Sequence, residues 1–212
     1  MMQHVYLLDD DPVELELLTR HCQGQPWLIE GFESVDALME AADEIQPGCL
    51  LIDFRMPGKD GVEVFGMVQE RALPLTCVLM TNFADIETCR HSLRAGMFDF
   101  IPKDGTPEKL LDTICRALEE QQNRCDADVE TRQRRDRWDG LTEREREVAT
   151  LLARGATLKQ VANTLDVSVQ TASKHRAKIF TKLAIKNEVD LFRLVDAIGY
   201  DLAEVPVAAS QL

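Results

Sequence analysis

Short apolar runs alternate with longer, mixed stretches through the first half of this 212-residue chain. Four of the runs have the length and composition of buried β-strands, and they lie at residues 4–8, 48–52, 75–80 and 98–101. Helix-like segments lie between them, so the pattern predicts repeated β-α units and a parallel sheet. The carboxyl ends of the strands in such a sheet share one edge, and ligands bind there.

Polar residues with reactive groups follow these runs directly. They are Asp9, Asp10, Asp53, Thr81 and Lys103. We expect the strand ends to bring them together. Three acidic groups at one point repel each other unless a cation joins them, and hard oxygen ligands suit Mg²⁺, which is often bound together with a phosphate. The set therefore predicts a phosphoryl-transfer site.

Local explanations exist for some of these polar positions. Asp11 is followed by Pro12 and Glu14, so we expect it to be the N-cap of a helix, with Glu14 completing a capping box. Asp9 and Asp10 have no such local use. Taken singly, Thr81 could end its strand and Lys103 could be a solvated charge, so the argument for chemistry rests on the whole set.

The second half of the chain has a helical pattern. Three helix starts with capping signals follow one another at Thr142, Thr157 and Ser168, and their apolar positions recur with the 3.6-residue period. A four-residue connection, residues 165–168, joins the second and third helices, which suits a helix-turn-helix. The third helix carries a run of basic side chains with no acidic residue between them: Lys174, His175, Arg176, Lys178 and Lys182.

Charge is unevenly distributed along the chain, whose overall net charge is −13. Residues 1–120 hold 9 Lys and Arg against 23 Asp and Glu, whereas residues 141–199 hold 10 against 7. Residues 121–140 mix 5 basic with 5 acidic residues and have Val129 and Trp138 as their large apolar groups. The pattern predicts an acidic domain at 1–120, a partly helical linker at 121–138, a mildly basic domain at 139–199 and a frayed tail at 200–212.

The composition narrows the class of protein. An apolar content of 45% supports a real core, and the apolar runs are far shorter than a membrane span. We expect a cytoplasmic protein with no membrane partner, because the N-terminus also lacks the pattern of a secretory leader. The cysteines show no C-x-x-C spacing and, with four scattered histidines, form no zinc motif.

Residues 3–120 resemble the receiver domain of two-component response regulators. The resemblance rests on Asp9-Asp10, on D-F-R-M-P-G-K-D-G from Asp53, on Thr81, and on G-M-F-D-F-I-P-K with Phe100 three residues before Lys103. It implies a doubly wound, flavodoxin-like α/β fold with a five-stranded parallel sheet. One departure is Asp104, which stands where the family usually has a proline.

The resemblance also implies roles for the residues of the acidic edge. Asp53 would accept a phosphoryl group from the phosphohistidine of a sensor kinase. Asp10, Asp53 and the Arg55 carbonyl would hold Mg²⁺, with Asp9 assisting through water. Lys103 and Thr81 would contact the phosphoryl oxygens, and Phe100 would rotate inward as a switch when Thr81 moves.

Residues 141–183 resemble the LuxR-type DNA-binding domain, over the segment L-T-E-R-E-R-E-V-A-T-L-L to K-I-F-T-K-L. Together the two resemblances indicate a FixJ/NarL-type response regulator that is not an enzyme, with a second, smaller all-α domain. They imply contacts with double-stranded DNA from the third helix, made by Gln170, Thr171, Ser173, Lys174, Arg176, Ala177, Lys178 and Lys182. Ser173 stands where the family commonly has lysine, so we expect a different operator preference.

The apolar final helix at 188–198 predicts a dimer contact, and we expect homodimerisation on phosphorylation together with contact to RNA polymerase.

Two alternatives compete with this interpretation. A haloacid-dehalogenase-like phosphatase would use Asp9 and Asp11, but we find no later acidic pair to hold its Mg²⁺. A DNA-binding protein with a relic receiver would not depend on phosphorylation, and Asp104 beside Lys103 mildly favours it.

Overall fold

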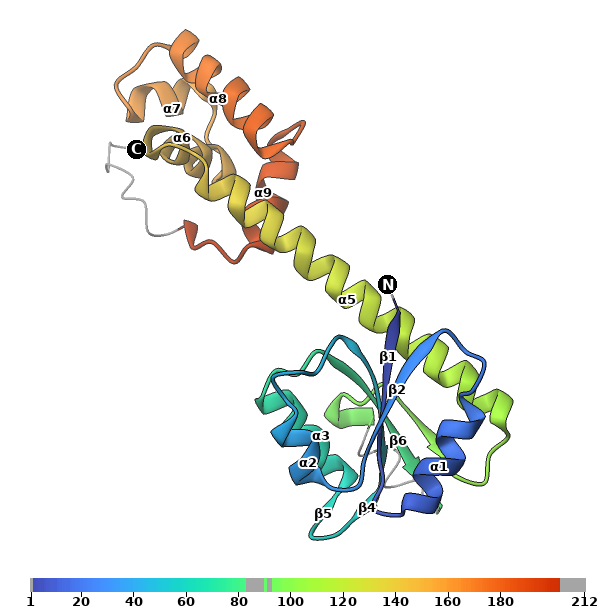
Figure 1. Ribbon diagram of the computed structural model, residues 1–212. Coiled ribbons are helices and arrows are strands. Elements are labelled where there is room, and N and C mark those ends of the chain that lie inside the picture. Colours follow the sequence, from blue (N-terminus) through green and yellow to red (C-terminus); the bar gives the residue numbers. More distant parts are fainter. Residues whose placement is uncertain (1, 83–89, 91–92, 203–212) are drawn as a thin grey trace. The chain divides into compact units, whose positions relative to one another are not determined.

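The structure is a computed structural model that describes residues 2–82, 90 and 93–202 (Figure 1). The chain divides into two compact units, with the boundary after Cys125. None of the described helices is both long enough and apolar enough to cross a bilayer.

A five-stranded parallel sheet forms the centre of the first unit (Figure 1). Its order is β2-β1-β3-β6-β7, which is the flavodoxin-like arrangement predicted from the sequence. The strands are β1 (Gln3–Leu8), β2 (Trp27–Phe32), β3 (Gly48–Asp53), β6 (Leu75–Thr81) and β7 (Asp99–Pro102). The four apolar runs correspond to all of these strands except β2, an edge strand whose Glu30 and Gly31 interrupt its apolar pattern.

Both faces of the sheet are buried, which explains why its central strands are continuously apolar. Tyr6, Leu50 and Leu79 are in a core with α2 (Val35–Glu40) and α3 (Gly61–Glu70). The opposite face packs against α1 (Pro12–His21) and the first part of α5 (Pro107–Asp139). Asp11 caps α1 as expected, since its carboxylate accepts the Val13 N–H at 2.8 Å.

A short hairpin of β4 (Arg55–Met56) and β5 (Lys59–Asp60) connects β3 to α3. Asp60 then caps α3 in a capping box with Glu63. Gly61 must be a glycine here, because a Cβ at this position would lie 2.5 Å from Leu79 Cδ1 and 3.0 Å from the Asp53 carbonyl oxygen. The start of α3 is therefore packed closely against the end of the strand that carries Asp53.

The helix α5 continues through the whole of the predicted linker, residues 121–138, and ends at Asp139. Ion pairs between residues four apart, Arg124 with Glu120 and Arg134 with Glu130, support its exposed part. Trp138, which the sequence placed in the linker, is 1% exposed and belongs to the core of the second unit. Its burial cannot be recognised from the sequence, because Trp138 stands among charged residues and its contacts come from the tertiary fold.

The described part of the second unit holds four further helices: α6 (Glu143–Ala153), α7 (Leu158–Thr164), α8 (Val169–Leu183) and α9 (Glu188–Ala197). The three predicted caps are present, because Thr142, Thr157 and Ser168 each accept a backbone N–H from three residues on. Between α7 and α8 lies the predicted short turn, in which Asp166 has a φ of 51°. The unit is therefore a helix-turn-helix whose second helix is α8.

The end of the described chain also packs onto this unit. Tyr200 lies against Trp138, with 4.7 Å between ring centroids, and Arg135 donates a hydrogen bond to the Ile198 carbonyl at 2.7 Å. The tail that the sequence placed at 200–212 therefore has ordered contacts at its start. Most of the apolar side chains of α9 are buried in the unit's own core, while Val189 and Phe192 are exposed.

Three cysteines of the first unit are buried thiols, Cys22, Cys49 and Cys77. Burial raises the pKa of the Cys22 thiol to about 11 and that of Cys77 to about 12, and it also raises the pKa of Cys49. Cys115 on α5 is exposed.

Candidate functional site

Three carboxylates meet at the carboxyl edge of the sheet. Asp9 and Asp10 follow β1, Asp53 ends β3, and one oxygen from each lies within 4.8 Å of the others. Asp9 and Asp53 are buried, whereas Asp10 is exposed. The parallel register of β1 and β3 aligns these strand ends, so the sheet itself assembles the cluster.

Lys103 supplies the positive charge opposite this cluster. Its ammonium forms ion pairs with Asp9 and, at 3.0 Å, with Asp53, and its side chain is 9% exposed. Burial alone would lower the pKa of Lys103, but the hydrogen bonds to Asp9 and Asp53 outweigh it and the pKa is raised. The side chain is therefore a fixed cation between the two buried carboxylates.

The environment of Asp53 has opposing effects on its charge. Burial raises the pKa of Asp53, and Lys103 partly offsets that rise, as does a backbone hydrogen bond from Arg55. The nearby Asp9 raises the pKa further. Such a carboxylate is stabilised by any additional cation, which is the condition expected for a metal or phosphoryl site.

A small cavity of about 50 Å³ lies beside Asp53 and is lined by Phe54, Arg55, Thr81 and Asn82 as well. Thr81 ends β6 and is 2% exposed. Its carbonyl accepts the Lys103 N–H at 2.9 Å, so the two residues are held together by their backbones. Phe100, in the adjacent β7, is partly buried against the core that includes Leu79.

The chain turns sharply after Lys103. Gly105 donates its N–H to the Pro102 carbonyl at 3.0 Å, and a Cβ on Gly105 would lie 2.9 Å from that same oxygen. Asp104, where the receiver family usually has proline, is exposed within this turn. A hydrogen-bonded turn that requires glycine therefore orients the backbone of Lys103.

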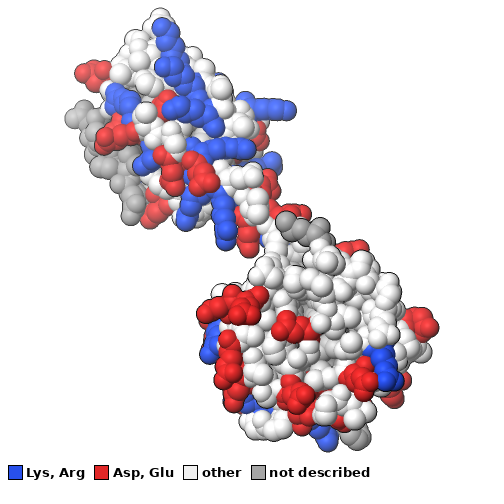
Figure 2. All heavy atoms as spheres, viewed as in Figure 1, with Lys and Arg blue, Asp and Glu red and all other residues white. Residues whose placement is uncertain are grey.

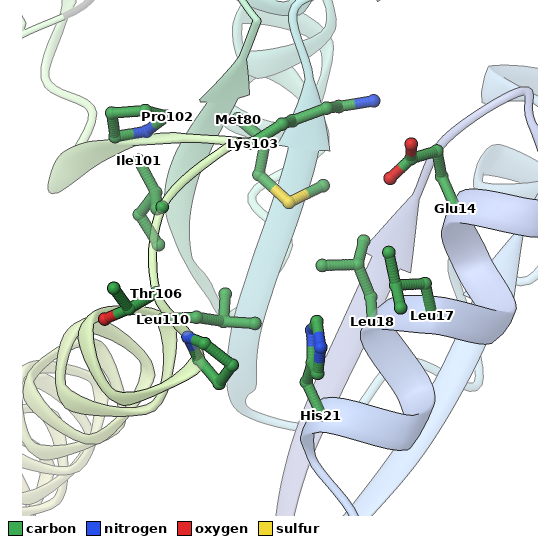
Figure 3. Close-up of a pocket in the computed structure, with 12 residues that line it drawn as sticks. Glu14, Leu17, Leu18, His21, Met80, Ile101, Pro102, Lys103, Thr106 and Leu110 are labelled. Carbon is green, nitrogen blue, oxygen red and sulfur yellow. The ribbon is translucent and has the colours of Figure 1, made fainter.

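A groove with a cavity of about 30 Å³ lies between α1 and the start of α5 (Figure 3). Figure 3 shows Glu14 and Lys103 toward one end of this groove and His21 toward the other, with leucines and Met80 between them. Glu14 borders the groove and does not form the capping box expected from the sequence. The groove adjoins the acidic site through Lys103.

The second unit presents a polar helix face to solvent. The candidate DNA-contacting residues on α8 that are exposed are Gln170, Ser173, Lys174, Ala177, Lys178 and Lys182. Lys and Arg side chains are numerous on this unit, whereas Asp and Glu predominate on the first unit (Figure 2). Thr171 is half-buried, and its N–H is bound by Ser168 at the start of the helix.

Two of the basic residues assigned to DNA from the sequence also have partners within the protein. Arg176 pairs with Glu188 at 2.6 Å and lies over the Phe180 ring, 4.1 Å from its centroid. Lys182 pairs with the buried Glu145 at 2.6 Å. Neither acidic partner is recognisable from the sequence, because each lies on a different helix from its basic partner.

Two features define a class of protein: an acidic cluster paired with a lysine at the sheet edge of a flavodoxin-like domain, and a helix-turn-helix. Residues 5–115 match the response regulator receiver domain, and residues 139–195 match the bacterial regulatory proteins of the luxR family. The chain belongs to the response regulators of the FixJ/NarL type, which are two-component transcriptional regulators with a LuxR-type DNA-binding domain.

Similar proteins span almost the full length of the chain. The response regulator TodT of Pseudomonas putida is 29% identical over 92% of this chain and 86% of its own, and FixJ of Bradyrhizobium diazoefficiens is 26% identical over 92% and 96%. The solved structure of the response regulator StyR is 30% identical, with a TM-score of 0.76 over 92% of this chain and 99% of that one.

Proposed function

We propose that a sensor histidine kinase phosphorylates this response regulator on Asp53, and that phosphorylation controls its binding to DNA. Residues 1–120 would act as the receiver, 121–138 as a linker, 139–199 as the DNA-binding domain and 200–212 as a tail. The ion pairs of Lys103 with Asp9 and Asp53 carry the proposal, because this arrangement supports transfer of an anionic group to Asp53.

Transfer would proceed by attack of an Asp53 carboxylate oxygen on the phosphorus of a phosphohistidine, with cleavage of the N–P bond. The product is an acyl phosphate. Phosphoryl transfer depends mainly on positioning and on charge neutralisation. Lys103 is held 3.0 Å from Asp53 and can pair with the incoming oxygens, and Thr81 lines the same small cavity, where its hydroxyl can donate to them.

The donor set at this edge also fits Mg²⁺. Asp10, Asp53 and the Arg55 carbonyl would hold the ion, and Asp9 would assist through water; carboxylate and carbonyl oxygens are the ligands that Mg²⁺ prefers. When bound, Mg²⁺ supplies positive charge to the phosphoryl oxygens. Lys103 already neutralises part of the negative charge of Asp9 and Asp53. Asp10 is exposed, so an ion can reach it from solvent.

The signal would pass from Thr81 to Phe100 and then to the receiver surface. A shift of Thr81 toward the phosphoryl group would also act on Lys103, since its N–H is bound to the Thr81 carbonyl. Inward rotation of Phe100 would then change a surface used for homodimerisation. We further propose that the protein acts in the cytoplasm and that its DNA-bound form contacts RNA polymerase.

On the DNA side, α8 would enter the major groove as the second helix of the helix-turn-helix. Base contacts would come from Gln170, Ser173, Lys174 and Ala177, and backbone contacts from Thr171, Arg176, Lys178 and Lys182. Arg176 and Lys182 would have to exchange or share their partners Glu188 and Glu145 in order to reach phosphate.

Incubation with a small phosphodonor and Mg²⁺ tests the acceptor. We expect an acid-stable, base-labile acyl phosphate in the natural chain and none in Asp53→Asn, because the amide has nearly the same shape but is a poor nucleophile. Asp36→Asn, which changes an exposed aspartate of α2, is the matched control and should be labelled normally. Normal labelling of Asp53→Asn would exclude Asp53 as the acceptor, and no labelling of the natural chain would favour a relic receiver.

A further inference from the structure

The side chain at the centre of the outward face of α8 is small. Residues 170, 174, 177 and 181 fall on one side of a helix, because their spacings are three, four and seven residues. Gln170, Lys174, Ala177 and Thr181 are all exposed. Ala177 lies in the middle of this set, so the longer side chains stand on either side of a single methyl group.

Thr181 makes the neighbouring surface apolar as well. Its hydroxyl donates to the Ala177 carbonyl at 3.0 Å, so the hydrogen-bonding group of this side chain is directed back to the helix backbone. The methyl group is then the part of Thr181 that remains for an outside partner. Ala177 and Thr181 together place two methyl groups one helical turn apart.

Two lysines complete the walls of this surface. A shallow hollow of about 330 Å³ is lined by Ala177, Lys178, Thr181 and Lys182. Because the Lys182 ammonium pairs with Glu145 at 2.6 Å, this lysine borders the hollow mainly with its apolar stem. The surface is therefore an apolar hollow at the edge of a basic helix face, and we call these four residues the α8 hollow.

We propose that the α8 hollow receives the C5-methyl group of a thymine in the operator, which makes Ala177 and Thr181 specificity-determining residues. This inference rests on the proposed entry of α8 into the major groove. Thymine is the base that presents a methyl group at that edge, and alanine and threonine methyl groups are suitable contacts for it. The lysines beside the hollow match the charge of the flanking phosphates.

An ordered water is the competing occupant. A bound water needs several polar partners, and the hydroxyl of Thr181 already has one in the Ala177 carbonyl. The apolar character of the walls therefore favours a methyl group. The two occupants make opposite predictions when thymine is replaced by uracil, because uracil keeps every hydrogen-bonding group and lacks only the methyl.

The test uses the full-length chain treated with a small phosphodonor and Mg²⁺. Its preferred DNA is first selected from a random pool, and each thymine of that DNA is then replaced singly by uracil. We expect one thymine in each half-site at which the replacement weakens binding about fourfold, which is the effect of losing one buried methyl contact. Binding to random DNA should not change.

Three variants show whether the α8 hollow is responsible. Ala177→Gly and Thr181→Ser each remove a methyl group from the hollow, and Thr181→Ser keeps the hydroxyl that binds the helix backbone. Both should bind the thymine and uracil DNAs almost equally at the sensitive position. Thr181→Val, which keeps the methyl and loses the hydroxyl, is the control and should retain the fourfold difference.

The outcomes separate this inference from the proposed function. Selective binding that is insensitive to uracil at every position, or a sensitivity that Ala177→Gly and Thr181→Ser leave unchanged, would overturn the thymine contact and leave the response-regulator function intact. A chain that selects no DNA sequence after labelling at Asp53 would overturn both. Loss of sensitivity in the two methyl-removing variants, and its retention in Thr181→Val, supports the contact.

Discussion

The ion pair between Glu145 and Lys182 should make the stability of the second unit depend on pH. The Glu145 side chain is 7% exposed; it accepts hydrogen bonds from Lys182 at 2.6 Å and from the Thr142 N–H at 3.0 Å. The Lys182 hydrogen bond, and then that from the Thr142 backbone, lower the pKa of Glu145 from 4.5 to about 2. The carboxylate form of Glu145 is therefore stabilised in the folded state.

The size of the effect follows from linkage between protonation and folding. A fall from 4.5 to about 2 corresponds to about 3 kcal/mol of unfolding free energy. Because the Lys182 side chain is 41% exposed, solvent screens the pair, and we expect about 1–2 kcal/mol. Since the folded pKa is the lower one, this stabilisation is present above pH 4.5 and is lost as the pH falls toward 2.

Glu145→Gln isolates the charge, because glutamine can still accept the Thr142 N–H in a capping box. The comparison is best made in a Trp27→Phe background, since Trp27 and Trp138 are the two tryptophans and Trp138 is buried in the second unit. Urea unfolding followed by Trp138 fluorescence should show Glu145→Gln to be less stable by about 1–2 kcal/mol at pH 7. The difference should shrink below pH 4.5 and vanish near pH 2.

The difference between the two proteins isolates the charge of Glu145, because other carboxylates titrate in the same range and contribute equally to both. A difference of the same size at pH 7 and pH 3 would refute the reasoning, since a lost packing contact does not titrate. Equal stability at pH 7 would show that solvent screening removes the whole contribution of the pair.

The remaining predictions concern DNA binding, module boundaries and assembly. Lys174→Ala should weaken binding to selected DNA more than to random DNA, whereas Lys178→Ala should weaken both alike and reduce the slope of log K against log salt concentration by about one. Titrations at several salt concentrations distinguish the two variants, and equal losses on both DNAs for Lys174→Ala would exclude base reading. A fragment of residues 126–212 should unfold at a higher temperature than one of residues 139–212, because the shorter fragment lacks the buried Trp138; equal thermal midpoints would contradict its role in the core. Sedimentation should show a shift from monomer to dimer with phosphodonor, and a chain already dimeric without it would place the switch elsewhere.

The acidic site could be predicted from sequence because strand topology places it. Asp53 and Lys103 are 50 positions apart, yet both follow short apolar runs, and parallel strands bring such positions to one edge. The edge strand β2 could not be predicted in this way, because Glu30 and Gly31 interrupt its apolar pattern. The local apolar pattern therefore predicted the position of the acidic cluster but not every strand of the sheet.

The ion pairs of the basic residues on α8 could not be predicted from the sequence. A run of lysines and arginines looks uniform in the sequence, but Arg176 and Lys182 have acidic partners 12 and 37 residues away. No periodic signal connects Lys182 to Glu145, since the pairing depends on how α6 packs against α8. Trp138 is a similar case, because its burial comes from tertiary contacts such as that with Tyr200.

The labelling rate of the buried thiols of the first unit can measure how often this unit unfolds. Cys22 and Cys77 are buried, and with pKa values raised to about 11 and about 12 their thiols are also protonated at neutral pH, so an alkylating reagent does not react with these two residues while the unit is folded. The exposed Cys115 reacts without any unfolding. The rate at which Cys22, Cys49 and Cys77 acquire label, measured on the peptides that carry them, therefore reports how often the receiver exposes its core.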